Sequence, residues 1–410
     1  MFLKKVLFLS YDGLTDPLGQ SQILPYLLGL AQLGHQITII SFEKPQNYAL
    51  RKKIIEALVL DKIDWQPIFY TKNPPIFSTL FDVWQMRKKA VQLHKIKHFD
   101  IIHCRSYISA LVGEYLKDKF KSTIPIKFIF DMRGFWADER VDGGLWNLKN
   151  PVFNQIYKFF KRKETDFLLK ADTTITLTEN AKTEILSWKN LENTPIKVIP
   201  CCVDTVLFDF EGQKNTPNKP FILSYLGSLG TWYLVDEMLH FFSCLLKTKP
   251  DAIFSFITPD NPNIILEKIQ KYNIPAEKII IQKAERKEVP NLIKESNISI
   301  FFIKTSYSKK GSSATKLGEI LACGMPTIIN GNMGDNDYLF EKYNFGALVK
   351  EFSENAYMEV IKNLDNILFV PRETLRNVAL DYFSLEKGIQ KYNEVYTSIT
   401  NYELSITDKI

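Results

Sequence analysis

Cysteine and histidine are both scarce in this sequence, with five of each among 410 residues. The cysteines show neither the ligand spacing of a zinc site nor a C-x-x-C pair. An odd, scattered set of thiols is typical of proteins from a reducing compartment. The sequence therefore predicts no metal site, and it favours a cytoplasmic protein. The five cysteines are Cys104, Cys201, Cys202, Cys244 and Cys323.

Long apolar runs are absent too. No stretch approaches the roughly 20 apolar residues that a membrane-spanning helix requires. The N-terminal apolar run stops at Asp12 and lacks the small-residue cleavage site of a signal peptide, so a first β-strand explains it better. We expect a protein that rests, at most, peripherally on the inner face of the cell membrane.

The sequence also lacks repeats, low-complexity tracts and the G-x-G-x-x-G fingerprint of dinucleotide-binding enzymes. The missing fingerprint argues against a nicotinamide oxidoreductase. What is present is the composition of a soluble globular protein, with 45% hydrophobic and 24% charged residues. A chain of 410 residues is too long for one compact core, so two domains are expected.

Short strand-like runs alternate with helical patterns, such as Gln20–Leu33, in both halves of the chain. The polar segment Glu211–Pro220, rich in helix and strand breakers, indicates a linker. The pattern predicts an α/β protein with two Rossmann-like, doubly wound parallel sheets facing a cleft. The expected domains are 1–205 and 206–382, with a helical segment over 383–410 that returns to the first domain. The expected strands are 6–10, 37–42, 67–70, 101–104, 126–130, 173–178 and 196–199, then 221–226, 252–258, 279–282, 298–303, 326–330 and 347–349.

Basic charge is concentrated in the first half. Residues 1–200 hold 29 Lys and Arg against 20 Asp and Glu, whereas the remainder holds 23 against 26. Each basic cluster by itself suits a solvated helix face. Together, on one half only, they predict a surface for anionic lipid or an anionic acceptor. Nucleic acid is not expected, because no binding motif accompanies the charge. The clusters are Arg51–Lys53, Arg87–Lys89, and Lys158 with Lys161–Lys163.

The stretch Ser306–Asn330 contains a short helix with two different faces. A Gly-Ser-Ser run opens the helix, so free backbone N–H groups and the positive end of the helix dipole can receive a phosphate. A carboxylate further along the helix suits a sugar hydroxyl, such as that of a ribose. An ordinary amphipathic helix with an exposed Lys316–Glu319 pair fits equally well. The polar face carries Ser312, Thr315, Lys316 and Glu319, and the apolar face carries Ala314, Leu317, Ile320 and Leu321.

Two places in the first half are candidate binding sites at strand ends. The loop Asp12–Gln22 runs directly into a helix start, where a phosphate can approach the backbone, although a plain turn fits as well. His103 lies in the fourth strand, and Asp131 and Arg133 follow the fifth. These side chains suit acceptor or sugar contacts. The alternative is an internal Asp–Arg pair with Trp136 as a core residue, and His103 by itself suits an ordinary core histidine.

Three loops of the second half are further candidates. The backbone of Gly227–Gly230 can meet phosphate, although glycine-rich turns of this kind are common. Lys283–Arg286 can present its backbone to a base and its arginine to a phosphate. The D-x-D sequence of Asp335 and Asp337 is interpreted as a loop motif without metal.

With these residues placed, the chain resembles the retaining glycosyltransferases of family 4, which have the two-domain GT-B architecture. The resemblance runs along nearly the whole chain. It is most specific at Thr315–Pro326, which is similar to the subgroup with a Thr-Lys-Leu-x-Glu helix at the donor site. The other matching segments are the loop glycine Gly19, Gly34-His35, the domain crossing Ile199–Phe208, and the closing segment Tyr382–Lys387.

The resemblance implies a nucleotide-diphosphate-sugar donor on the second domain, with Glu319 binding the ribose. It also implies that Gly19 closes on the phosphate from the first domain, and that the loop ending at Arg286 surrounds the base. The candidate catalytic residues are Asp131, Arg133 and Glu319. The candidate donor-binding residues are Gly19, Gly227, Ser228, Arg286, Ser312, Ser313, Thr315, Lys316 and Glu319.

The sequence departs from the family pattern at the donor site. Gly311 takes the place of the first glutamate of an E-x7-E pair, so the usual sugar-contacting carboxylate is missing. Ser228 and Tyr233 take the places of the usual phosphate-binding Arg and Lys. Asp131 also replaces a histidine found in many members. Another cation must then offset the diphosphate, and the candidates are Lys316, Arg286, Lys309 and Lys310.

The sequence therefore predicts a metal-independent, retaining glycosyltransferase. It would move a hexose-type sugar from a nucleotide-diphosphate-sugar to a cell-envelope or surface glycan acceptor, lipid-linked acceptors included. No cofactor is expected besides the donor substrate. Two alternatives stay open. One is a catalytically silent or partner-dependent subunit, because Gly311 replaces a carboxylate. The other is a nucleotide-sugar epimerase or phosphorylase on a similar frame.

Overall fold

The computed structural model describes residues 3–74, 76–211 and 220–401, and most of the expected linker lies outside these ranges. The chain forms two compact units. The first comprises Met1–Pro200 together with Leu385–Ile410, and the second comprises Cys201–Ser384. The divisions therefore fall at residues 200 and 384, where the sequence pattern placed them at 205 and 382.

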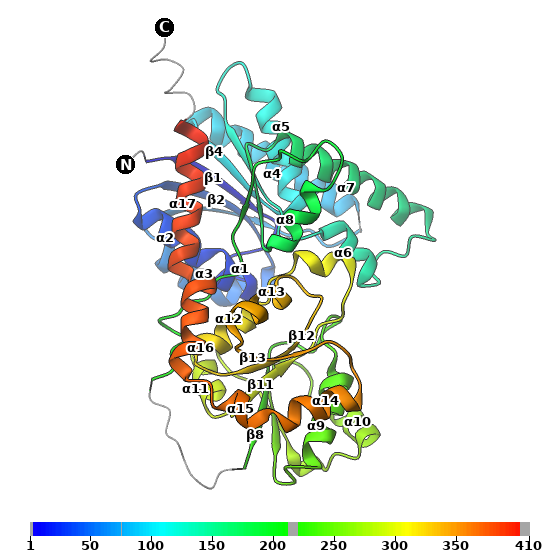
Figure 1. Cartoon of the computed structure of the whole chain (residues 1–410). Coiled ribbons are helices and arrows are strands. Elements are labelled where there is room, and N and C mark those ends of the chain that lie inside the picture. The colour runs from blue at the N-terminus through cyan, green and yellow to red at the C-terminus, as the bar shows by residue number, and fades with distance from the viewer. Residues whose placement is uncertain (1–2, 75, 212–219, 402–410) are drawn as a thin grey trace. The chain divides into compact units, whose positions relative to one another are not determined.

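The first unit contains a seven-stranded parallel sheet in the order β3-β2-β1-β4-β5-β6-β7 (Figure 1). Helices follow most of its strands, and β1 is buried from Val6 to Ser10. Near-continuous burial of this kind is typical of a parallel sheet covered on both faces. The strands are β1 (Lys5–Ser10), β2 (Gln36–Glu43), β3 (Ile63–Phe69), β4 (Ile101–Arg105), β5 (Lys127–Asp131), β6 (Thr173–Thr176) and β7 (Ile196–Val198).

The last helix of the chain, α17 (Leu385–Asn401), belongs to the first unit and packs on α2. A Cβ atom placed on Gly29 would lie 2.2 Å from Ile389 Cδ1, so the absence of a side chain at Gly29 permits this close approach. The other helices are α1 (Pro17–Gln22), α2 (Leu24–Gln32), α3 (Pro45–Val59), α4 (Phe77–Lys97), α5 (Ser106–Phe120), α6 (Trp136–Asp142), α7 (Pro151–Lys170) and α8 (Glu179–Leu186).

The second unit contains a six-stranded parallel sheet in the order β10-β9-β8-β11-β12-β13. Its strands are β8 (Ile222–Leu226), β9 (Ile253–Ile257), β10 (Ile279–Gln282), β11 (Ile298–Phe301), β12 (Thr327–Asn330) and β13 (Gly346–Val349). Its α-helices are α9 (Val235–Leu246), α10 (Asn263–Ile269), α11 (Val289–Lys294), α12 (Thr315–Ala322), α13 (Asn336–Tyr343), α14 (Glu354–Lys362), α15 (Leu364–Leu368) and α16 (Arg372–Val378).

These two parallel sheets with their helices confirm the predicted two-domain α/β fold, and every predicted strand is present. The predicted helix Gln20–Leu33 is instead broken at Ile23 into α1 and α2. Pro25 explains the break, because it has no N–H to donate and its ring clashes with the carbonyl one turn earlier. Within the described ranges, no helix is long and apolar enough to cross a membrane.

Candidate active site

The helix α12 carries most of the predicted donor-binding residues and begins later than the Gly-Ser-Ser run. Residues 307–311 form a 3₁₀ turn, Ser312 and Ala314 are extended, and the helix starts at Thr315. No side chain caps this start, so backbone N–H groups of the first turn are left for a ligand or water. Gly324 follows the helix at φ +66°, a conformation that favours glycine.

Both polar residues in the middle of α12 are buried: Lys316 is 8% exposed and Glu319 is 7% exposed. Neither forms an ion pair with the other, since Glu319 pairs instead with Arg286. The alternative interpretation of an exposed Lys316–Glu319 pair is therefore wrong. The helix α12 therefore presents Lys316 and Glu319 to the protein interior and not to the solvent.

Lys316 lies in an aromatic enclosure. Its Nζ atom is 3.5 Å from the centre of the Tyr233 ring and 4.3 Å from that of Tyr225, and it donates a hydrogen bond to Tyr225 Oη at 3.2 Å. Burial lowers the pKa of Lys316 well below its usual range. In the described part of the chain no carboxylate forms an ion pair with this ammonium group. The Glu319 carboxylate acts against burial and raises the pKa of Lys316, but it forms its ion pair with Arg286.

The loop after β8 is shaped around this ammonium group. Gly227 has φ +114°, and a Cβ atom there would lie 2.9 Å from Lys316 Nζ. The Tyr225 hydroxyl donates to the carbonyl of Ser228, which connects the loop to the lysine. The backbone N–H of Leu229 is already bound by the carboxylate of Asp260. In the predicted loop, Gly227 therefore lies next to Lys316, and Ser228 is linked to the lysine through Tyr225. The amide of Leu229 is already occupied by Asp260.

Arg286 and Glu319, both predicted donor-binding residues, form an ion pair with 3.0 Å between Arg286 Nη1 and Glu319 Oε1. The guanidinium also lies over the Phe208 ring, 5.1 Å from its centre. Burial raises the pKa of Glu319, while Arg286 acts in the opposite direction. Arg286 is thus committed to Glu319 in this structure, whereas Lys316 forms no ion pair with a carboxylate of the described residues.

The remaining predicted groups of this unit have structural contacts. Ser313 Oγ accepts a hydrogen bond from the backbone of Cys201 at 3.2 Å. Lys309 Nζ lies 3.6 Å from the centre of the Trp232 ring. The two carboxylates of the D-x-D sequence also have partners within the protein. Asp335 accepts a hydrogen bond from the Tyr382 hydroxyl, and Asp337 accepts one from the backbone N–H of Asn332.

In the first unit, the ends of β4 and β5 form a buried polar cluster beneath α17. His103 Nδ1 is 2.8 Å from Tyr396 Oη, and its Nε2 is 3.4 Å from Asp131 Oδ2. Tyr392 Oη donates to the same carboxylate at 3.2 Å. Burial lowers the pKa of His103, so the neutral imidazole is favoured. Burial also acts to raise the pKa of Asp131, but nearby Arg133 and His103 outweigh it, and the pKa lies below its usual range.

The two predicted catalytic residues at this strand end differ in exposure. Asp131 is 1% exposed, and its carboxylate contacts Tyr392 and His103. Arg133, two residues later, is half-buried and has φ +58°, an uncommon conformation for a side-chain-bearing residue. Arg105, next to Asp131 in the register of β4 and β5, is also buried and lies 3.5 Å from the Asp12 carboxylate.

The loop Asp12–Gln22 is organised by Glu43 at the end of β2. Its carboxylate accepts hydrogen bonds from the backbone N–H groups of Leu14 and Thr15, at 2.8 and 3.0 Å, and from the hydroxyl of Ser41. A Cβ atom on Gly19 would lie 2.0 Å from the carbonyl oxygen of Gly13. The absence of a side chain at Gly19 is therefore required by the packing of the loop itself.

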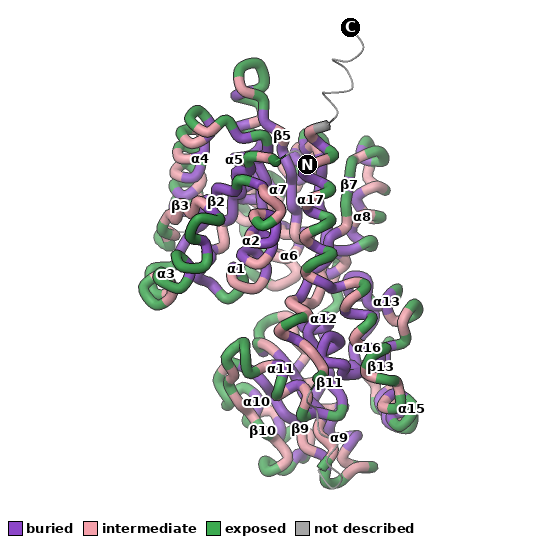
Figure 2. Tube along the Cα trace, turned by 90° about the vertical axis from the view of Figure 1, so that its left-hand side faces the viewer, coloured by how far each residue is buried: buried purple, intermediate pink, exposed green. Residues whose placement is uncertain are grey.

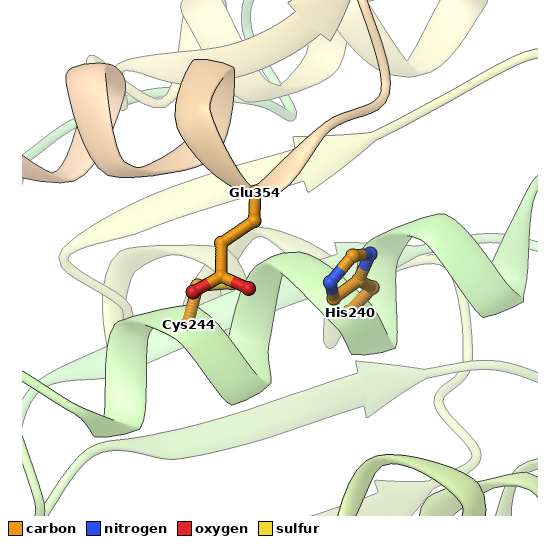
Figure 3. Close-up of side chains that lie close together, drawn as sticks. All are labelled: His240, Cys244 and Glu354. Atoms are coloured by element: carbon orange, nitrogen blue, oxygen red, sulfur yellow. The ribbon is translucent and has the colours of Figure 1, made fainter.

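One cluster outside these sites has the residue types of a metal site. His240 and Cys244, one turn apart on α9, face Glu354 at the start of α14 (Figure 3), with their ligand atoms within 4.8 Å of one another. Lys247 already donates to the Glu354 carboxylate, and burial raises the pKa of the Cys244 thiol. The cluster is thus neutralised by an ammonium group and serves as a contact between α9 and α14.

The two parallel sheets and their covering helices define a two-domain, doubly wound α/β protein. Two family models match consecutive parts of the chain, Glycosyltransferase Family 4 over residues 26–207 and Glycosyl transferases group 1 over 208–366. The chain is accordingly a GT-B glycosyltransferase of the family 4 type. No curated protein matches the chain by sequence.

Solved structures agree with this fold along nearly the whole chain. A glycosyltransferase from Rickettsia africae has a TM-score of 0.70 at 19% identity, covering 98% of this chain and 100% of the other. Anabaena HepE in complex with UDP and glucose has a TM-score of 0.68 at 13% identity, with 96% and 100% covered. A sucrose-phosphate synthase from Thermosynechococcus elongatus has a TM-score of 0.69 at 14% identity, with 97% and 99% covered.

Proposed function

We propose that this protein transfers a hexose-type sugar from a nucleotide-diphosphate-sugar to a cell-envelope or surface glycan acceptor, lipid-linked acceptors included. The bond between the anomeric carbon and the diphosphate breaks, and the diphosphate leaves with the electron pair. The acceptor hydroxyl forms the new bond and gives up its proton. Retention of configuration rests on the resemblance to family 4, and the reaction would need no metal.

The observation that carries the proposal is the buried ammonium group of Lys316, with which no carboxylate of the described residues forms an ion pair. It lies beside Gly227 and within the first turn of α12, where uncapped N–H groups favour an anion. Tyr233 stands where the resembled family has a phosphate-binding lysine, and the Lys316 ammonium group contacts its ring. We therefore assign to Lys316 the role of neutralising the negative charge of the diphosphate.

Glu319 is assigned to the ribose, with Arg286 holding its carboxylate in place. A carboxylate that is oriented before the ligand arrives binds a hydroxyl without further ordering cost. Ser312, Ser313 and Thr315 are assigned to the diphosphate or sugar through their backbone, and Arg133 is assigned to the acceptor side. UDP and UDP-glucose are bound by the structurally similar Anabaena HepE, which supports a nucleotide-sugar donor here.

A panel of nucleotide-sugars, offered with and without extracts of cell-envelope glycans, tests this proposal. We expect at least one donor to bind and to release its nucleoside diphosphate, faster when acceptor is present. Absence of binding, hydrolysis and nucleotide release with every donor would overturn it. Release of nucleoside diphosphate only in the presence of acceptor also separates a transferase from an epimerase.

A catalytically silent or partner-dependent subunit is the second candidate, and Gly311 is the observation that favours it. That position, buried at the end of a 3₁₀ turn, bears no carboxylate to hold the sugar. The substitution Glu319→Ala separates the two functions. A large loss of turnover supports the transferase, whereas unchanged function in the cell supports a binding role.

A further inference from the structure

One face of α4, formed by Phe77, Leu80, Phe81 and Trp84, is left exposed by the fold of the first unit. These four side chains, called the α4 face below, are 70%, 62%, 49% and 46% exposed. Their spacing of three, four and seven residues places them on one side of the first two turns of the helix. Single exposed apolar residues are common, but four bulky ones on one stripe indicate an interaction surface.

The charge around the α4 face has one sign. Arg87, Lys88 and Lys89 follow it along the helix, and Lys88 Nζ lies 5.3 Å from the centre of the Trp84 ring. The only acidic residue of α4 is Asp82, which is buried and accepts hydrogen bonds from Tyr11 and from the backbone of Thr71. The helix thus presents apolar and cationic groups to the solvent and no carboxylate.

The surface continues beyond α4 at the edge of the sheet. Phe69, at the end of the edge strand β3, is 52% exposed and lines a groove with Trp84 and Lys88. Tyr48 of α3 contacts the Phe69 ring, with 5.1 Å between the ring centres. Exposed residues recur along α3 and α4 in Figure 2, and on α3 they include Leu50, Ile54 and Leu58 at four-residue spacing.

We infer that the α4 face inserts into the interfacial region of a bilayer that contains anionic lipid. Bulky apolar and aromatic residues beside Lys and Arg are the composition of helices that lie in the membrane interface. Anionic lipid supplies the charge that Arg87 and Lys88, the exposed cations beside the α4 face, lack in the protein. The inference gives a location to the peripheral membrane contact that the basic first half of the sequence predicts. It rests on the proposed function in one respect, because it would bring the first unit to lipid-linked acceptors.

Flotation of the full chain with vesicles tests the inference without any donor or acceptor, so its failure is distinct from failure of the glycosyltransferase proposal. We expect binding to vesicles of phosphatidylcholine with phosphatidylglycerol and little binding to phosphatidylcholine alone. Raised salt should weaken binding, because the attraction of Lys and Arg is screened. Absence of binding to the anionic vesicles would overturn the inference.

Variants then locate the contact. The combined change Phe77→Ser, Leu80→Ser, Phe81→Ser and Trp84→Ser should weaken partition to anionic vesicles by at least about tenfold, because the inserted apolar surface is lost. The matched control is Ile96→Ser on the same helix, which removes a side chain that is 76% exposed and lies outside the α4 face. Its partition should equal that of the unchanged protein.

The substituted side chains are exposed, so thermal unfolding should show that each variant keeps its fold. Equal vesicle binding by the fourfold variant and the unchanged protein would contradict the α4 face as the contact. So would sedimentation that shows a dimer of the unchanged protein and a monomer of the fourfold variant, with no vesicle binding by either. That result would identify a second copy of the chain as the occupant.

Discussion

The ammonium nitrogen of Lys316 lies 3.5 Å from the centre of the Tyr233 ring. A cation held against an aromatic face in a desolvated site is attracted by the ring quadrupole, by about 2 kcal/mol. That attraction offsets only part of the cost of removing an ammonium group from water. Burial of this ammonium group therefore lowers the stability of the fold, which agrees with the anion-binding role proposed for Lys316.

Replacement of Lys316 by methionine should weaken nucleotide binding without weakening the fold. A hydrogen bond to a charged group contributes about 1.5–3 kcal/mol, so the Kd for the nucleoside diphosphate of the donor should rise about 10- to 100-fold. Calorimetric titration measures this change. The free energy of unfolding should stay equal or rise, because a buried charge is removed. A Kd equal to that of the unchanged protein would contradict the assignment.

The unfolding free energy should depend on pH through Lys316. Burial lowers the pKa of this ammonium group in the folded protein, whereas in the unfolded chain it returns to about 10.4. Between these two values the unfolded chain binds more protons, so the free energy of unfolding should rise with pH up to about 10.4. Urea unfolding across mildly alkaline pH measures the slope, and Lys316→Met should reduce it.

The ion pair of Arg286 and Glu319 can be tested by a double-mutant cycle. Arg286→Met should cost about 1–2 kcal/mol of unfolding free energy, since it leaves a buried carboxylate unpaired, and the partial exposure of Arg286 limits the loss. In the Glu319→Gln background the same change should cost less than about 0.5 kcal/mol. Equal costs in both backgrounds would show that the two side chains are not coupled.

Gly19→Ala should disturb the loop that Glu43 organises. A Cβ atom 2.0 Å from the carbonyl oxygen of Gly13 forces a backbone shift, and overpacking of this kind costs about 1–3 kcal/mol. Gly230→Ala is the control, because nothing lies within 4 Å of a Cβ atom there. Thermal unfolding of both variants compares them. If the two lose the same stability, the tight packing at Gly19 is not the cause.

Tyr396→Phe and Tyr392→Phe should each loosen α17. Each change removes one hydrogen bond to a buried polar group, to His103 or to Asp131, and should cost about 1–3 kcal/mol of unfolding free energy. Amide hydrogen exchange in α17 should speed up as well. Tyr338→Phe, at a half-exposed ring of the second unit, is the control and should change neither quantity.

The strands and α12 were predictable because they follow local patterns. Short apolar or alternating runs predicted every strand, and the break at Ile23 could have been predicted from Pro25 alone. Partners of polar side chains were not predictable in this way. Lys316 and Glu319 stand at helical spacing, yet they bind Tyr225 and Arg286, which are distant in sequence.

Contacts between residues distant in sequence also explain why some structurally important residues could not be predicted. Glu43 ends a strand and looks like any surface glutamate, but it is fully buried and holds the backbone of the loop after β1. Tyr392 and Tyr396 read as part of an amphipathic helix, yet their hydroxyl groups contact Asp131 and His103. Such pairings form only when the sheet and α17 are assembled, so they cannot be predicted from the local sequence.

The place of α17 in the chain has a consequence for biosynthesis. Every strand of the first unit leaves the ribosome before the second unit is made, whereas α17 is translated after it. Until then, His103 and Asp131 lack the tyrosine hydroxyl groups that complete their hydrogen bonds. The nascent first unit therefore exposes polar groups that α17 covers later, and its completion depends on prior synthesis of the second unit.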